Sequence, residues 1–307
     1  MRMTSVAAAL FVGLATVSAA QAERLTDQPL VDAAWLNQHL GDPSLLVIDI
    51  RDPGKDGAAP YAAGHVPGAV EAQYTAYGWR ANIGGAPGKL PEISDIGPKI
   101  AALGVNDDTQ VVIYSAGTDA SEFGAATRTY WTLKVLGHDN VALLDGGFKA
   151  WSEAGTPVST DAVTPKAGNF TAEFRPELRA EVAEVQKAIE SDTNLVDARS
   201  VAQFIGKEKT NTVKALGTIP TAVNINFPNF WNAEAGRFAT REAILEQVKA
   251  VGLSDENGII AFCNTGHLAS IAWFGLSEVA GLKNVRLYDG SMSEWTLDPS
   301  RQVVAKQ

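Results

Sequence analysis

The chain carries the same succession of segments twice, and this duplication restricts the possible folds more than any other feature of its 307 residues. The run LVIDIR at 46–51 returns as NLVDAR at 194–199, GHVPGA at 64–69 returns as GTIPTA at 217–222, and VALLDGG at 141–147 returns as VRLYDGS at 285–291. Within each copy, short apolar runs typical of buried parallel strands alternate with helical segments. Such a repeat predicts an α/β protein with two tandem domains, each a parallel sheet with helices on both faces.

The positions of the elements follow from hydrophobic periodicity and turn residues. In the first copy we expect helices at about 31–40, 96–103 and 125–136, and buried strands at 45–48, 110–114 and 141–144. In the second copy we expect helices at 180–190 and from about 268 onward, and strands at 194–197, at 259–262 and from 285. A stretch with Gly and Pro residues but no periodicity separates the copies. The predicted order is an N-terminal domain at 23–155, a linker at 156–178 and a C-terminal domain at 179–307.

Residues 1–22 have the features of a secretory signal peptide. A basic start is followed by an apolar run at 6–17 and by Ala20-Gln21-Ala22, which predicts cleavage before Glu23. The apolar run is shorter than the roughly 20 residues that span a bilayer, and no later segment is long enough either. We therefore expect a mature protein exported to the periplasm.

The charge balance argues against nucleic acids and membranes as partners. The chain has 25 Lys and Arg residues against 35 Asp and Glu residues. A mildly acidic protein of this kind offers no attraction to phosphate backbones or anionic lipids.

The chemistry is expected at Cys263, which is the only cysteine in the chain. Cysteines of exported proteins usually pair as disulfides, so a lone thiol suggests use rather than structure. Cys263 follows a predicted buried strand and precedes a predicted helix, where unpaired backbone N–H groups stabilise a thiolate over a thiol. The sequence therefore predicts a nucleophile, with a buried inert cysteine as the alternative.

The first copy serves as an internal control for this site. Ser115 stands where the second copy has Cys263, and the loop after Ser115 is expected to be longer, through Glu122. A longer loop would not fold the same cradle around one atom, and serine lacks the acidity of a thiol. We therefore expect one active site, in the second domain.

These motifs resemble the rhodanese family of tandem-domain sulfurtransferases, in which only the C-terminal domain is active. The first family signature is similar to residues 61–69, the second is similar to residues 288–295 with Met292 where an aromatic is usual, and the pattern Cys263-x-x-Gly266-x-x-Ala269 is similar to the active loop. The resemblance implies an enzyme of the thiosulfate or 3-mercaptopyruvate sulfurtransferase type. Sulfur would pass from the donor to Cys263 as a persulfide, and then to cyanide or a thiol.

The resemblance also implies which residues bind the substrate. The loop amides would hold the persulfide charge, and they belong to Asn264, Thr265, Gly266, His267, Leu268 and Ala269. Arg199 occupies the place where the family keeps a substrate-binding arginine, although an arginine paired structurally with a nearby carboxylate is the alternative. No metal and no organic cofactor are implied.

Two departures from the family pattern bear on the donor. Thiosulfate-using relatives carry a lysine two residues after the cysteine, where this chain has Thr265. Mercaptopyruvate-using relatives carry small and hydroxyl residues there. A protonated His267 could supply part of the missing positive charge, and a solvent-facing loop histidine is the alternative.

Two other functions compete with this interpretation. Cysteine phosphatases carry Cys-x5-Arg, but the residue six after Cys263 is Ala269, which disfavours that class. A non-catalytic carrier that holds a persulfide for a partner stays open, with a periplasmic sulfur-carrier protein as a candidate partner.

Overall fold

The computed structural model describes residues 24–54 and 57–306, so the predicted signal peptide lies outside the described residues. The first half is built on a five-stranded parallel sheet in the order β1-β7-β6-β2-β3. Its strands are β1 (Leu30–Val31), β2 (Leu45–Asp49), β3 (Val70–Glu71), β6 (Gln110–Tyr114) and β7 (Val141–Leu144). The expected strands at 110–114 and 141–144 are confirmed to the residue, because both are fully buried and, apart from Gln110, are runs of apolar and aromatic residues.

The second half repeats this plan on a four-stranded parallel sheet in the order β13-β12-β8-β9. Its strands are β8 (Asn194–Asp197), β9 (Val223–Asn224), β12 (Ile259–Phe262) and β13 (Val285–Leu287). Two α/β units in tandem are thereby confirmed. The strands of the two sheets follow the same spatial order: β6 lies beside β2 in the first, and β12 lies beside β8 in the second. The ends of β6 and β12 therefore occupy matching places.

Both faces of each sheet are covered. Along β6, Val111 and Ile113 belong to one apolar cluster, whereas Val112 and Tyr114 belong to another. Alternate side chains of a strand point to opposite faces, so this division means that both faces are buried. The helices that provide the cover are α1 (Ala33–His39), α2 (Pro60–Ala63), α3 (Ile93–Ala102), α4 (Ala120–Val135), α5 (Gly147–Glu153), α6 (Val182–Ile189), α7 (Val201–Phe204), α8 (Arg241–Ala250), α9 (His267–Trp273) and α10 (Ser291–Trp295).

Helix α4 begins five residues earlier than the sequence indicated. The side chain of Asp119 accepts a hydrogen bond from the backbone N–H of Glu122 and caps the helix. The prediction placed these residues in a long loop. The loop after β6 therefore has five residues, Ser115 to Asp119, against four in the second half, Cys263 to Gly266.

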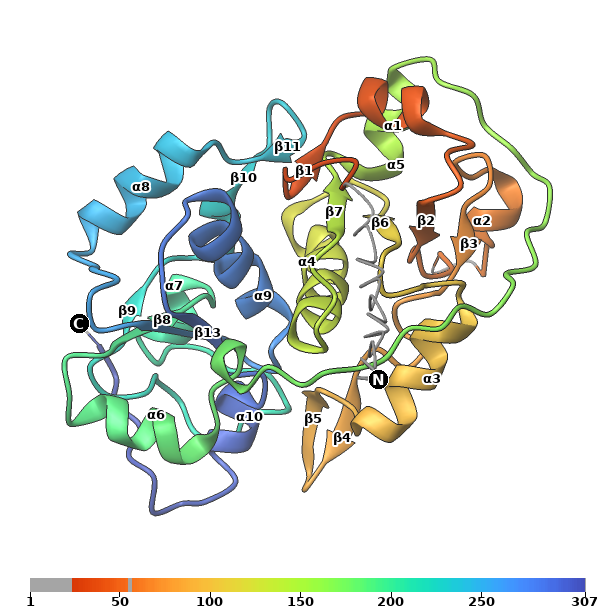
Figure 1. The fold of residues 1–307 in the computed structure, drawn as a ribbon. Helices are drawn as coiled ribbons and strands as arrows, with labels where there is room; N and C mark the ends of the chain where they lie inside the picture. The colour runs from red at the N-terminus through yellow and green to blue at the C-terminus, as the bar shows by residue number, and fades with distance from the viewer. Residues whose placement is uncertain (1–23, 55–56, 307) are drawn as a thin grey trace, which may run out of the picture.

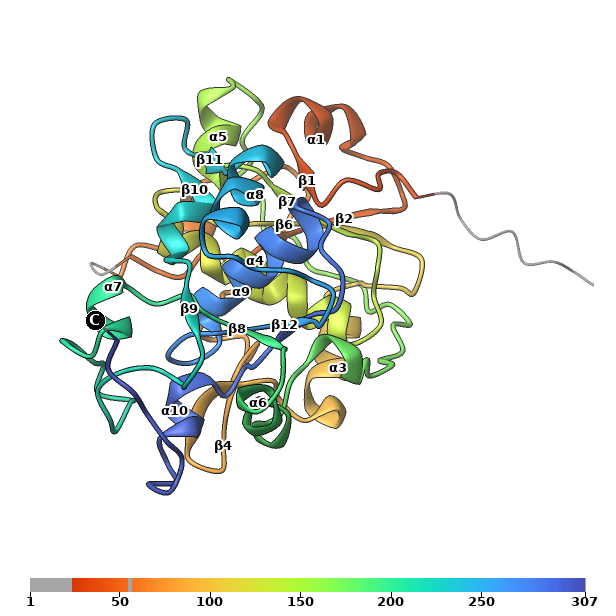
Figure 2. The same ribbon diagram turned by 90° about the vertical axis from the view of Figure 1, so that its left-hand side faces the viewer.

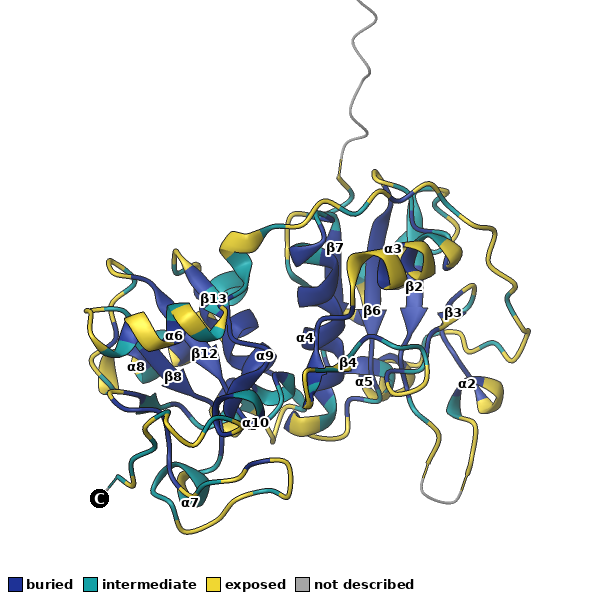
Figure 3. Cartoon of the chain, turned by 90° about the horizontal axis from the view of Figure 1, so that it is seen from below, coloured by how far each residue is buried: buried dark blue, intermediate teal, exposed yellow. Residues whose placement is uncertain are grey.

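Helices α4 and α9 pack against each other at the centre of the molecule (Figures 1 and 2). Both are almost entirely buried, in contrast to the exposed outer sides of α3 and α6 (Figure 3). The ring of Tyr130 in α4 meets that of Phe274 edge-on at 4.9 Å, and a single apolar cluster runs through both halves. The boundary between the halves is thus part of the hydrophobic core.

Each half also sends a β-hairpin onto the other half. The first hairpin is β4 (Ala81–Ile83) with β5 (Ala86–Lys89), and the second is β10 (Trp231–Asn232) with β11 (Arg237–Phe238). The backbone N–H of Leu90 donates to Asp289 Oδ2 over 2.6 Å, and the N–H of Phe238 donates to Asp145 Oδ1 over 2.8 Å. These two aspartates hold matching places in the repeat. The exchange brings the first hairpin close to the loop of Cys263.

The segment between the halves is held against the first half. The backbone N–H of Phe170 donates to the carbonyl of Val105, and that of Arg175 donates to the carbonyl of Val135. One turn of 3-10 helix, η1 (Pro176–Leu178), ends this extended course. In the described part of the chain, no helix is long and apolar enough to cross a bilayer.

Candidate active site

Cys263 lies directly after β12, at the carboxyl end of a central strand, and is 1% exposed. Its loop is gathered around one hydroxyl. The Oγ of Ser291 accepts hydrogen bonds from the backbone N–H of Cys263 over 3.0 Å and of Gly266 over 3.1 Å, and donates to the carbonyl of Tyr288 over 2.8 Å. The same Oγ lies 4.0 Å from Sγ of Cys263. Ser291 thereby fixes both ends of the loop beneath the thiol.

The other amides of the loop are left available. Within the described residues, no group accepts a hydrogen bond from the backbone N–H of Asn264 or of Thr265. Helix α9 also begins without a side-chain cap. Donors that are already fixed in place stabilise negative charge that develops beside them. The predicted role of these amides is therefore compatible with the geometry.

Gly266 turns the chain from the loop into α9. Its φ of +73° lies in the left-handed region, which disfavours residues with a Cβ. A Cβ at this position would lie 2.5 Å from Nη1 of Arg128 and 2.6 Å from the carbonyl oxygen of Asp289. Only glycine fits between these groups and the loop.

Arg128 comes from α4 of the first half and supports the loop from behind. Its side chain is fully buried, its Nη1 donates to the carbonyl of Gly266 over 3.2 Å, and its Nη2 lies 3.7 Å from Asp289. The guanidinium also stacks over Trp131 at 4.8 Å. Burial lowers the pKa of Arg128, and the carboxylate of Asp289 opposes that shift. A cation of the first half thus lies against the loop that carries Cys263.

His267 is bound on both ring nitrogens by residues of the first half. Its Nε2 lies 2.8 Å from the carbonyl of Ser121, which can only accept, so Nε2 carries the proton. Nδ1 then accepts from the hydroxyl of Tyr74 over 2.8 Å. Desolvation, with contributions from Arg80 and other nearby charges, lowers the pKa of His267 to about 4. The expectation that a protonated His267 supplies positive charge is therefore wrong near neutral pH, because the imidazole is neutral there.

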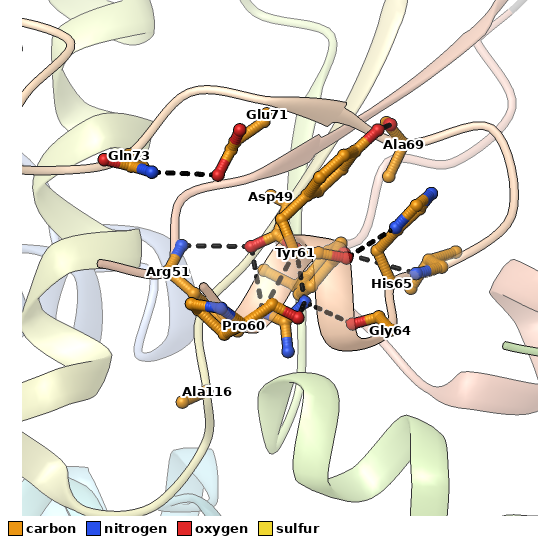
Figure 4. A network of polar contacts seen from close by, with 12 residues as sticks. Asp49, Arg51, Pro60, Tyr61, Gly64, His65, Ala69, Glu71, Gln73 and Ala116 are labelled. Atoms are coloured by element: carbon orange, nitrogen blue, oxygen red, sulfur yellow. Dashed lines mark hydrogen bonds and ion pairs between the residues drawn. The ribbon is translucent and has the colours of Figure 1, made fainter. Parts of the chain in front are cut away.

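Arg199 adopts the structural arrangement that the sequence left as an alternative. It is fully buried, and its Nε and Nη2 donate to the carboxylate of Asp197 over 2.6–3.1 Å, while Nη2 also donates to the carbonyl of Gly217. Arg51 of the first half makes the same contacts with Asp49 and Gly64 (Figure 4). The same arrangement therefore occurs in both halves. The charge of Arg199 is neutralised by Asp197, and contact of Arg199 with a donor stays a prediction.

The remaining predicted loop residues have separate surroundings. Asn264 donates from Nδ2 to Oε1 of Gln203 over 2.8 Å, and its own Oδ1 is buried without a partner in the described chain. Leu268 is half-buried against the core and Ala269 is fully buried. The side chains of these last two residues pack, so only their backbone groups face the loop chemistry.

The matching loop of the first half, which begins at Ser115, contains its own anion. The carboxylate of Glu122 accepts from the backbone N–H of Ala116 over 2.7 Å and of Gly117 over 2.8 Å. Desolvation raises the pKa of Glu122, and these two hydrogen bonds oppose that shift. The difference between the copies is therefore smaller in loop length than the sequence indicated. Ser115 and an occupied amide cradle distinguish the first half.

The sequence did not reveal the contribution of the segment 70–91, in which we predicted no helix and no strand. Tyr74 and Arg80 come from this segment, and so does Gly88, where a Cβ would lie 2.4 Å from the carbonyl oxygen of Thr265. Gly88 has a φ of +90°, so the presence of a glycine was the only signal in the local sequence.

In the described part of the chain, no group of three or more His, Cys, Asp or Glu side chains is arranged to hold a metal ion.

The model of the rhodanese-like domain matches residues 32–154 and again residues 181–298. The chain therefore belongs to the rhodanese family, as the sequence motifs indicated. It is a rhodanese-type sulfurtransferase with tandem domains.

Relatives with this organisation extend over nearly the whole chain. A 3-mercaptopyruvate sulfurtransferase from Escherichia coli is 30% identical over 272 residues, which cover 86% of this chain and 94% of that protein. A proposed thiosulfate sulfurtransferase from Haloferax volcanii is 30% identical over 278 residues, which cover 87% and 92%. The crystal structure of SseA from Escherichia coli, described as a 3-mercaptopyruvate sulfotransferase, matches with a TM-score of 0.74 at 28% identity and covers 86% of this chain and 98% of that one.

Proposed function

We propose that the chain moves a sulfane sulfur from thiosulfate, or a related small anionic donor, to cyanide or a thiol through a persulfide on Cys263. One observation carries the proposal: the thiol lies in a loop whose free amides and neighbouring buried arginine favour negative charge on sulfur. The matching loop of the first half has Ser115 and fills its amides with Glu122. The activity is therefore assigned to the second half.

The first step is a displacement on the outer sulfur of the donor. The thiolate of Cys263 forms a new S–S bond, and the S–S bond of thiosulfate breaks, so that sulfite leaves with the electron pair. Total charge is conserved, because thiolate and thiosulfate become persulfide and sulfite. In the second step cyanide takes the outer sulfur as thiocyanate, and the thiolate is restored. The amides of Asn264 and Thr265 would stabilise the persulfide charge, and such fixed donors contribute about 3 kcal/mol each in related oxyanion sites.

3-Mercaptopyruvate is the second candidate donor. Its C–S bond would break, the carbon would take up the electron pair and the thiol proton, and pyruvate would leave. Thr265 lines a cavity beside the loop, and its hydroxyl could donate to the carboxylate or carbonyl of this donor. The relative from Escherichia coli that carries this name supports the same choice.

Mass spectrometry of the intact protein tests the proposal. Exposure to each donor without an acceptor should add one sulfur atom to the chain, and Cys263→Ser should add none. A steady-state assay with cyanide then separates an enzyme from a carrier, since a carrier gives one turnover and stalls. Absence of a persulfide with both donors would overturn the proposal.

The proposal extends to the place where the chain works. A signal peptide at 1–22 would send the mature protein, starting at Glu23, to the periplasm. Fractionation of a bacterial host that expresses the full chain, with N-terminal sequencing of the recovered protein, tests this. A cytoplasmic protein that still begins at Met1 would contradict it.

A further inference from the structure

A cavity of about 330 Å³ lies between the two halves beside the catalytic loop. The second half contributes Thr265, two residues after Cys263, and Thr212. The first half contributes all the other lining residues, including Tyr74, Thr75, Arg80 and Asn82. The wall therefore combines three threonine hydroxyls and an amide with a single charged side chain, which is Arg80.

Arg80 is held in place but not neutralised. Its guanidinium stacks over the ring of Tyr74 at 4.8 Å, and Tyr74 is in turn bonded to His267 of the catalytic loop. Within the described residues, no carboxylate pairs with Arg80 and no group accepts a hydrogen bond from it. Arg51, Arg128 and Arg199, by contrast, each face a carboxylate. A half-buried arginine with all its donors free is suited to an external oxyanion.

A larger cavity that Tyr74 also lines has the opposite character. It measures about 470 Å³ and reaches His267 from the first half. Its wall carries Asp52, Asp119 and Glu122, while its arginine, Arg51, is paired with Asp49. Like charges disfavour an anion there. Of these two neighbouring cavities, the one with Arg80 is therefore the one that attracts an anionic donor.

The repeat offers an internal comparison for Arg80 as well. Arg80 directly precedes the hairpin that the first half sends onto the catalytic loop. At the entrance of the matching hairpin, which the second half sends onto the silent loop, stand Phe230 and Trp231. Phe230 is fully buried in the core. Arg237 of that second hairpin donates to the carbonyl of Gly236, whereas the guanidinium of Arg80 has no hydrogen-bond partner among the described residues.

We infer that Arg80 binds the charged end of the sulfur donor, so that the catalytically silent half provides the cation that the catalytic loop lacks at Thr265. The inference rests on the proposed sulfur transfer and names the ligand as a small oxyanion, either the sulfonate of thiosulfate or the carboxylate of 3-mercaptopyruvate. The fork of Arg80 can bind two oxygens of either group, and Thr265 can donate a third hydrogen bond. Arg80 is thereby a donor-positioning residue.

The test compares Arg80→Met with Arg241→Met. Arg241 is an exposed residue at the start of α8, so its replacement changes the net charge equally and leaves the cavity intact. We expect Arg80→Met to lower kcat/KM with thiosulfate by about tenfold to a hundredfold, mainly through KM, and to lower it less with the singly charged 3-mercaptopyruvate. Arg80→Lys should recover part of the loss, because it keeps the charge but not the fork. Arg241→Met should match the wild type.

Calorimetry separates this inference from the proposed function. In a Cys263→Ser background, thiosulfate should bind, and addition of Arg80→Met should weaken that binding by a similar factor. If the wild type forms no persulfide while anion binding still depends on Arg80, sulfur transfer fails and the anion site stands. If Arg80→Met is correctly folded and leaves both thiosulfate binding and kcat/KM within twofold of the wild type, the inference is overturned and the sulfur transfer stands.

Discussion

The hydroxyl of Tyr74 donates a hydrogen bond to Nδ1 of His267 across 2.8 Å and so connects the silent half to the catalytic loop. The bond requires a neutral imidazole, because a protonated ring has no acceptor. Burial in turn keeps the pKa of His267 low, at about 4. The position of the loop therefore depends on the protonation state of one histidine.

Acidification should weaken this contact. Between its ordinary pKa of 6.5 and the folded value of about 4, His267 binds a proton in the unfolded chain but not in the folded one. The contribution of His267 to the free energy of unfolding is therefore complete above pH 6.5 and is lost as the pH drops toward 4. We expect the melting temperature of the wild type to fall more steeply across this window than that of His267→Gln. Thermal scans at several pH values check this, and parallel curves would show that another group titrates. Tyr74→Phe should lower the melting temperature at neutral pH.

Gly266→Ala should remove activity far beyond its effect on stability. A Cβ would meet Arg128 and Asp289, and the loop could relieve that contact only by moving away from its position over Ser291. A displacement of about 1 Å can cost about a hundredfold in rate.

Gly281→Ala is the matched control for this prediction. Gly281 has a φ of +75°, close to that of Gly266, but no atom lies within 4 Å of its Cβ position. Both variants should lose about 1–2 kcal/mol for the left-handed backbone, and only Gly266→Ala should lose thiocyanate production. Equal kcat values in the two variants would contradict the role given to the tight packing at Gly266.

Arg199→Met and Arg51→Met should destabilise the chain to a similar extent. Each leaves a buried aspartate without its partner, Asp197 in one half and Asp49 in the other, at a cost of about 3–5 kcal/mol. Urea unfolding compares the two variants directly. A selective loss of kcat/KM in folded Arg199→Met, absent from folded Arg51→Met, would instead restore the substrate role predicted from the sequence.

A thiol placed in the silent loop should stay inactive. In Cys263→Ser/Ser115→Cys, the carboxylate of Glu122 still accepts the amides of Ala116 and Gly117, and its charge repels a persulfide. We expect thiocyanate production below about a hundredth of the wild-type rate. Production above a few per cent would mean that the first loop differs from the second only in its missing thiol.

The features that could be predicted from the sequence are those that depend on residues of one continuous segment. Fully apolar runs defined β6, β7 and β12, and the repeat defined two sheets with Cys263 at the end of the central strand. Contacts across the halves were not predictable in this way. Arg80, Gly88 and Arg128 belong to the site through packing between segments more than 130 residues apart, and no local period marks that packing.

The expectations that the local sequence left open have the same origin. Arg199 follows a strand end and carries a charge, which suits a ligand as well as a structural pair; the structure shows its pair with Asp197, and contact with a donor stays a prediction. His267 is a polar loop residue in the sequence, yet Tyr74 and Ser121 enclose it. In both cases the partner, rather than the residue itself, determines the chemistry.

The joint core of α4 and α9 also has a consequence for the history of such a chain. A gene copied in tandem begins as two interchangeable units, either of which can later be lost. Here Tyr130 of one unit packs on Phe274 of the other, so loss of either unit would uncover an apolar face that favours aggregation. The shared core therefore ties the two units together, so that neither can be removed without exposing part of the hydrophobic cluster of the other.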